Sequence, residues 1–290
     1  MNFLALRIAP QWRYHKCRQC GDAQGFLYLR VIKARLALIL PPKRREKGGA
    51  LLPAGDCLMD ILASIRKMLV PIHREGYVFI LAGVVTMLVL GWLWEPLFWL
   101  CGLITCWIIY FFRDPPRVTP LGGGLIVSPA DGVVSAVGRA APPSELGLGP
   151  TPLARLSIFM SIFDCHVNRS PVDGRIAKIA YRPGLFLNAD LDKASEDNER
   201  NAFLFETPHG QLALVQIAGL IARRIVTAVT EGESPQAGER IGIIRFGSRV
   251  DVYLPEGFEI LAGQGQRAIA GETVLAAFGA DRRVHGFRKG

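Results

Sequence analysis

Two long uncharged stretches restrict how this chain can fold. The first runs from Tyr77 to Trp94 and the second from Leu97 to Phe112, and only Glu95 and Pro96 separate them. A helix of about 20 apolar residues spans the hydrocarbon core of a bilayer, so both stretches approach the required length. Tryptophan and tyrosine near their ends are typical of a membrane interface. The pattern predicts a transmembrane helical hairpin over residues 77–112; a buried hairpin in a soluble core is the alternative.

The charges beside the two stretches predict an orientation. Arg66, Lys67 and Arg74 precede the pair, Arg113 and Arg117 follow it, and the connecting turn carries no Lys or Arg. Lys and Arg concentrate on the cytoplasmic side of membrane proteins. Both ends of the hairpin are therefore expected in the cytoplasm, which places the main domain on the cytoplasmic side of the cell (inner) membrane.

The residues before the hairpin divide into two segments. Residues 59–76 place apolar side chains on one side and Arg66 and Lys67 on the other, which predicts an amphipathic helix at the membrane interface. Residues 1–58 form a basic leader, with 11 Lys and Arg against 3 Asp and Glu. We expect this leader to be disordered or absent from the native chain, with Met59 as the start.

The charge of the main domain argues against one class of partner. The chain carries a net charge of +9, but the leader alone accounts for about +8 of it. The rest of the chain is nearly neutral, so we predict that it does not bind nucleic acid.

From Val118 onward, short β-branched runs bounded by Gly and Pro replace the long apolar stretches. This pattern predicts strands. The expected strands are Leu125–Val127, Gly132–Val137, Leu156–Phe163, Arg175–Tyr181, Ala202–Phe205, Leu212–Ile217 and Ile241–Ile244. Residues 118–290 are therefore predicted to form a mainly β domain, a sandwich or a partly open barrel, with α+β character at its margins.

The cysteines and the known short motifs exclude several kinds of site. Cys17 and Cys20 form a lone pair without a second pair at metal-site spacing, and no disulfide framework is evident among the six cysteines. The chain also lacks a His-Glu-x-x-His motif and a phosphate-binding loop of the Walker type. We therefore predict no metal site.

The segment from Ile241 to Pro255 contains Gly247 and Ser248 between two apolar β-branched runs. Glycine has no Cβ, so its carbonyl is open to attack. The Ser248 hydroxyl can attack this carbonyl and cut the chain, provided that a base removes its proton. The alternative is a glycine bulge followed by an exposed serine, in a membrane-tethered β-domain that serves as a noncatalytic adaptor.

Two further residues complete a set suited to base-activated attack. His166 follows an apolar run at a strand end crowded with polar groups, and Asp131 lies in the turn Ser128-Pro129-Ala130-Asp131-Gly132. With Ser248 they supply an acid, a base and a nucleophile. A solvated loop histidine and an ordinary Asp-Gly turn are the alternatives. An uncleaved Ser/His/Asp hydrolase is a rival function, although no Gly-x-Ser-x-Gly motif is present.

Taken together, these segments resemble the proenzyme of the phosphatidylserine decarboxylase family in its short form. The matching segments are Phe111-Phe112-Arg113-Asp114-Pro115, Ser128–Gly132, Phe159–Gly174, Lys193–Asn201, Gln216–Ile225 and Arg245–Pro255. They occur in order over most of residues 59–255, which is more specific than any one of them.

The resemblance implies a covalent cofactor. The chain is expected to cut itself between Gly247 and Ser248, and Ser248 becomes a pyruvoyl group at the start of a small fragment. The large and small fragments then stay together as a heterodimer. The pyruvoyl carbonyl forms a Schiff base with phosphatidylserine, and loss of CO2 gives phosphatidylethanolamine, so membrane lipid is the expected partner.

The resemblance also suggests roles for individual residues. Ser248 is the pyruvoyl precursor, Asp131 supports maturation, and His166 matches the family's histidine near the decarboxylation centre. The longer bacterial form has a second histidine where this chain has Arg169, which leaves open whether His166 serves both steps. Arg223 and Arg224 are expected, as a pair that can bind an anion, to contact the substrate phosphate.

Overall fold

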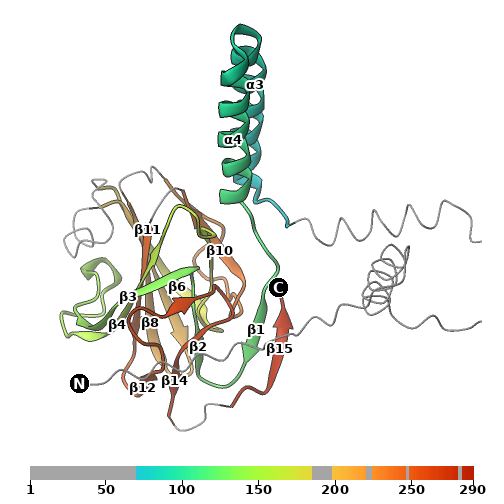
Figure 1. Cartoon of the computed structure of the whole chain (residues 1–290). Coiled ribbons are helices and arrows are strands. Elements are labelled where there is room, and N and C mark those ends of the chain that lie inside the picture. The colour runs from blue at the N-terminus through green and yellow to red at the C-terminus, as the bar shows by residue number, and fades with distance from the viewer. Residues whose placement is uncertain (1–69, 185–197, 220–223, 246–247, 280–282) are drawn as a thin grey trace, which may run out of the picture. The chain divides into compact units, whose positions relative to one another are not determined.

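The structure is a computed structural model that describes residues 70–184, 198–219, 224–245, 248–279 and 283–290 (Figure 1). The chain divides into two units, Met1–Ile61 and Leu62–Gly290, and all the described residues belong to the second. The leader and residues 59–69 of the expected interfacial helix lie outside the described residues. Residues 70–76 contain no α-helix: Ile72 forms a β-bridge with Arg113, and Arg74–Gly76 is a short 3-10 helix, η1.

Two α-helices follow directly, α3 (Tyr77–Leu93) and α4 (Glu95–Phe111), and they run side by side (Figure 1). The helical segment Arg74–Leu93 has a mean hydropathy of 2.2 and meets the length and composition of a membrane span, whereas α4 is a shorter apolar helix. Glycine permits their close contact. A Cβ at Gly83 would lie 2.7 Å from Thr105 Oγ1, and one at Gly91 would lie 2.8 Å from Phe98 Cβ.

After the helices, the described residues form four sheets whose neighbouring strands are all antiparallel. The largest has the strand order β13-β3-β4-β11-β8-β7-β6. Its strands are β13 (Arg267–Ala268), β3 (Gly132–Ala140), β4 (Leu153–Met160), β11 (Ser248–Leu254), β8 (Gly210–Ala218), β7 (Arg200–Thr207) and β6 (Arg175–Arg182). The short 3-10 helix η2 (Ser144–Leu146) interrupts the β3–β4 connection.

Three smaller sheets complete the domain, with the orders β5-β10-β9, β12-β14-β2 and β1-β15. Their strands are β5 (Val167–Arg169), β10 (Arg240–Ile244), β9 (Ile225–Thr227), β12 (Phe258–Ile260), β14 (Val274–Phe278), β2 (Leu125–Val127), β1 (Val118–Leu121) and β15 (Gly286–Lys289).

Both faces of the seven-stranded sheet are covered, as the alternation along β8 illustrates. Leu212 and Leu214 belong to the main core, which also contains residues of β2, β10 and β14 from the smaller sheets. Ala213 and Val215, which point to the opposite face, belong to a second cluster that includes Leu146 of η2. The main core thus lies between the large sheet and the smaller ones.

The prediction of a mainly β chain is confirmed. One predicted strand end is wrong, because β4 stops at Met160 rather than continuing to Phe163. Asp164 Oδ2 accepts a hydrogen bond from the Ser161 backbone at 2.8 Å, and Ser161 Oγ accepts one from the Phe163 backbone at 3.3 Å. These side chains close a turn in place of a longer strand.

Candidate active site

Ser248 is the first residue of β11, the central strand of the large sheet. It pairs with Met160 at the end of β4 and with Ala218 at the end of β8, so it lies where three strands end together. The preceding strand, β10, belongs to a different sheet, and it ends at Ile244. A three-residue connection therefore leads from one sheet to the other, and Gly247 within it lies outside the described residues.

The Ser248 side chain is fully buried, which excludes the exposed serine considered from the sequence. Its Oγ lies 4.0 Å from Met160 Sδ, and thioether sulfur is a weak acceptor. By strand alternation Ser248 shares a face with Val250 and Val252, which belong to the main core. The hydroxyl therefore lies at the edge of that core, without a strong acceptor among the described residues.

His166 borders the same connection. Its backbone carbonyl accepts a hydrogen bond from the Ile244 backbone at 3.2 Å, which places it beside the end of β10. Its side chain is fully buried, and its ring packs against Phe111 with centroids 4.3 Å apart and planes tilted by 31°. The alternative of a solvated loop histidine is therefore wrong.

The surroundings of His166 fix its protonation state. Burial lowers its pKa from 6.5 to about 4, outweighing the opposing effects of the Asp164 backbone and carboxylate. Nδ1 lies 3.0 Å from the Asp164 carbonyl oxygen, which only accepts, so Nδ1 carries the hydrogen. Near neutral pH the ring is uncharged with its lone pair on Nε2, as a general base requires.

Asp131 is held by other partners. Its Oδ2 accepts a hydrogen bond from Arg117 at 2.6 Å, and its Oδ1 accepts one from the Ala270 backbone at 2.8 Å. Burial, reinforced by the negative charge of Asp131, raises the pKa of the Cys165 thiol. The Arg169 backbone donates to Pro129 O at 2.9 Å, so the turn that carries Asp131 borders β5, the strand that follows His166. Asp131 does not occupy the position on His166 Nδ1 that an acid takes in a serine hydrolase.

Arg169, which stands where the longer family form has a second histidine, is fully buried and has a structural role. It donates hydrogen bonds to Gly238 O at 2.8 Å, to Asp114 Oδ1 at 3.2 Å and to Pro115 O at 3.0 Å. These bonds hold the chain that leaves α4 against β5. An arginine so engaged is not a proton acceptor.

A chain of buried amides near Ser248 was not identified as part of the site from the sequence. Asn168 Nδ2 lies 3.7 Å from Met160 Sδ, and Gln216 donates to Asn168 Oδ1 at 2.7 Å. Asn201 in turn donates to Gln216 Oε1 at 3.3 Å. All three lie in segments that carry the family resemblance, but only long-range pairing brings them together.

Of the two arginines expected to bind the substrate phosphate, the structure describes only Arg224. Arg223 lies outside the described residues. Arg224 is exposed, and its backbone carbonyl accepts a hydrogen bond from the Arg245 backbone at 3.2 Å, so it borders the β10–β11 connection.

An apolar cluster connects the base of the helices with the strands beside Ser248. Phe111 and Phe112 are fully buried with Cys165, Val167 of β5 and Ile243 of β10. The cluster therefore fixes the end of α4 to β5, which follows His166, and to β10, which leads towards Ser248. Within the described ranges, no group of three or more His, Cys, Asp or Glu side chains is placed to hold a metal ion.

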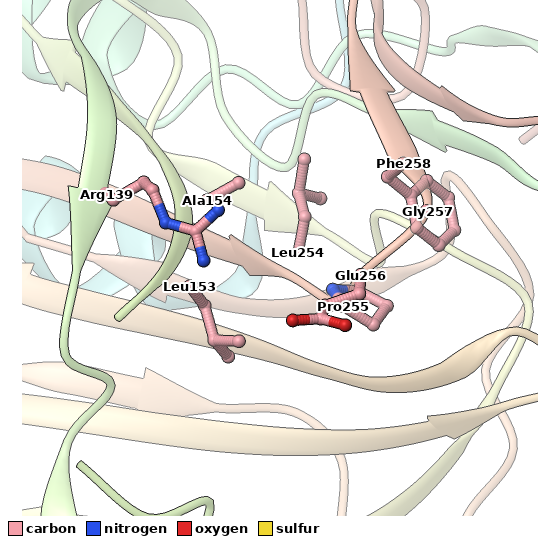
Figure 2. Close-up of a pocket in the computed structure, with 8 residues that line it drawn as sticks. All are labelled: Arg139, Leu153, Ala154, Leu254, Pro255, Glu256, Gly257 and Phe258. Carbon is pink, nitrogen blue, oxygen red and sulfur yellow. The ribbon is translucent and has the colours of Figure 1, made fainter. Parts of the chain in front are cut away.

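A pocket of about 280 Å³ lies at the opposite end of β11 (Figure 2). Leu254, Pro255 and Glu256 line it together with Arg139 of β3. Six residue steps separate Leu254 from Ser248, which corresponds to about 20 Å along a strand. This pocket is therefore separate from the site around Ser248 and His166.

Comparisons with known proteins show the family of this chain. A family model described as phosphatidylserine decarboxylase matches residues 104–276, which include Asp131, His166 and Ser248. The chain is also 59% identical over 232 residues to a protein named phosphatidylserine decarboxylase proenzyme from Beijerinckia indica subsp. indica. That alignment covers 80% of this chain and all of the relative.

Proposed function

Because this chain belongs to the phosphatidylserine decarboxylase family and is a decarboxylase, we propose that it converts phosphatidylserine to phosphatidylethanolamine and CO2 through a pyruvoyl group made from Ser248. The observation that carries the proposal is the position of Ser248, a fully buried serine that begins the central strand directly after Gly247 and the connection that His166 borders through its bond with Ile244.

The proposed maturation uses only atoms of the chain and water. Ser248 Oγ attacks the Gly247 carbonyl carbon, and the peptide bond is replaced by an ester. Removal of the Cα proton of residue 248 then expels the Gly247 carboxylate and leaves a dehydroalanine. Addition of water and loss of ammonia convert its enamine into a ketone. The position of Ser248, which directly follows Gly247 and is fixed as the first residue of β11, supports this step.

His166 is the proposed base for the first step, since its neutral state supports proton removal near neutral pH. Arg169 is committed to Asp114, so it does not replace the second histidine of the longer family form. We propose that His166 serves both maturation and decarboxylation. Asp131 supports maturation indirectly, by fixing Arg117 and the backbone at Ala270.

The surroundings of Ser248 fit a pyruvoyl group, since its side chain is buried beside Met160 Sδ, which the Asn168 amide also contacts. When formed, the group would supply an electron-withdrawing ketone for the loss of CO2. Arg223 and Arg224, next to the same connection, are proposed to bind the substrate phosphate.

The two fragments are proposed to remain together as a heterodimer. The fragment that begins at residue 248 contributes β11, which pairs with β4 on one side and β8 on the other. It also contributes β14 and β15, which pair with β2 and β1. Cutting before Ser248 breaks none of these strand pairings.

We further propose that α3 and α4 form the membrane hairpin of an inner-membrane protein, with the β-domain on the cytoplasmic side. The apolar surface of α3 supports this, because the segment Arg74–Leu93 is only 6% buried in its most apolar window. Trp92 and Trp94 at the far end of α3 are exposed, as interface anchors would be. A lipid substrate requires its site near the bilayer, and the apolar cluster at the helix base supplies this proximity.

Mass spectrometry of the purified full chain tests the proposal. We expect a fragment ending at Gly247 and a fragment of residues 248–290 whose first residue has the mass of a pyruvoyl group. The Ser248→Ala variant should remain one chain and release no CO2 from phosphatidylserine. A wild-type chain that stays intact yet decarboxylates the lipid contradicts the proposal, and fluorophosphonate labelling of that intact chain would instead support a hydrolase.

A further inference from the structure

Arg245 is the last described residue before the proposed cleavage site, and its side chain reaches the base of the helices. Its guanidinium forms an ion pair with the Glu75 carboxylate of η1. The same guanidinium lies over the Phe79 ring of α3, 5.2 Å from its centroid. Two residues that are 170 positions apart thus join the segment before Gly247 to the start of the helical hairpin.

The pair is sheltered from solvent, which strengthens it. The side chains of Arg245 and Glu75 are 19% and 24% exposed. Phe79 also stacks on Phe112, with centroids 5.4 Å apart and planes 16° apart, so the ring under Arg245 is itself fixed. Partly desolvated ion pairs and cation–π contacts are stronger than the same contacts at an exposed surface.

The backbone beside Arg245 is held as well. The Arg245 N–H donates to Arg224 O at 3.2 Å, and the Ile244 N–H donates to His166 O at 3.2 Å. On the other side of the connection, Ser248 is fixed by its pairing with Met160 and Ala218. Both ends of the connection are therefore anchored, and Arg245 supplies the anchor that comes from the hairpin.

We propose that Arg245 is a positioning residue for self-cleavage, whose contacts with Glu75 and Phe79 hold the upstream side of the Gly247–Ser248 bond in register with the Ser248 hydroxyl. The inference rests on the proposed function. Attack on a carbonyl is sensitive to the position of the reacting atoms, and a displacement of about 1 Å slows such steps by about 100-fold. The pair also makes cutting depend on the packing of the hairpin, because Glu75 and Phe79 belong to it.

A charge exchange tests the role of the pair. The full-length chain is synthesised in a cell-free system with phospholipid vesicles, and the conversion of the intact chain to two fragments is followed over time on a denaturing gel. Arg245→Glu and Glu75→Arg should each slow conversion by about tenfold or more, because each opposes two like charges where one ion pair stood. The double variant Glu75→Arg/Arg245→Glu should recover most of the rate.

Three comparisons separate positioning from general destabilisation. Arg175→Glu disrupts an exposed pair with Glu206, whose side chains are 61% and 48% exposed, and it should cleave at the wild-type rate. The same Arg245 and Glu75 changes in a Ser248→Ala background keep every chain intact, so their unfolding temperatures can be compared directly. Arg245→Met keeps the apolar stem but removes the charge, and it should also cleave slowly while remaining folded.

The outcomes distinguish this inference from the proposed function. Single variants that cleave at the wild-type rate, or slow variants that the charge exchange fails to rescue, overturn the role of Arg245 while wild-type cleavage still stands. A wild-type chain that does not cleave overturns the proposed function itself. Slow cleavage that tracks a lowered unfolding temperature in the Ser248→Ala background also rejects positioning.

Discussion

The buried state of His166 predicts a specific dependence of stability on pH. In the folded protein burial lowers the pKa of this imidazole from 6.5 to about 4, so the folded state binds fewer protons than the unfolded state between these values. Its contribution to stability is fully present above about pH 6.5 and is lost as the pH falls to about 4. The difference of about 2.5 pKa units corresponds to about 3 kcal/mol.

The measurement uses uncleaved protein, so that one chain unfolds. The free energy of unfolding of the Ser248→Ala chain is determined by guanidinium titration in detergent, followed by far-ultraviolet circular dichroism at pH 7 and at pH 4. Adding His166→Gln should reduce the loss of stability between the two pH values by about 3 kcal/mol. Adding Gln211→Ala, at an exposed residue that does not titrate, should leave the loss unchanged.

A single result would refute this reasoning. If the chains with and without His166 lose the same stability between pH 7 and pH 4, the imidazole is not held neutral by burial. The argument that His166 is a neutral base would then no longer hold. Other titrating groups contribute equally to both chains, so they cancel in the comparison.

Two further predictions concern the ion pair between Asp131 and Arg117 and the contact between helices α3 and α4. Asp131→Ala leaves Arg117 without its carboxylate partner and should lower the stability of the Ser248→Ala chain by about 3 to 5 kcal/mol, whereas Glu206→Ala in the exposed pair with Arg175 should change it by at most about 1 kcal/mol. Gly83→Ala places a methyl group 2.7 Å from Thr105 Oγ1 and should cost about 1 to 3 kcal/mol, whereas Gly102→Ala, whose methyl group meets Met87 Sδ at 3.4 Å, should be tolerated; unfolding temperatures in detergent check both.

The strands could be predicted from the sequence because their signals are local. In β8 every second residue belongs to the same buried face, and Gly210 begins the strand at a positive φ of 115° that other residues rarely adopt. The end of β4 was mispredicted because Asp164 closes a turn through its side chain. Apolar residues such as Phe163 suggest a strand, but a side-chain hydrogen bond to the backbone overrides them.

The site could be predicted only as a set of residues. The sequence placed His166 and Ser248 in two separate motifs, and the hydrogen bond that brings His166 to the end of β10 joins residues far apart in the chain. The role of Arg169 was equally hidden, since its partner Asp114 lies 55 positions earlier. Burial of Ser248 could not be inferred either, because a glycine-serine pair is also typical of an exposed bulge.

The position of the proposed cut follows from the arrangement of the sheets. Within β11, a break would separate residues that pair with β4 and β8 on both sides, and each lost backbone hydrogen bond costs about 1 kcal/mol. Before Ser248, the chain passes from the sheet of β10 to the sheet of β11, and the strand pairing ends at Ser248. A cut at this point leaves both sheets intact. The connection that would be cut follows Ile244, whose backbone N–H donates to His166 O, and precedes the buried hydroxyl of Ser248.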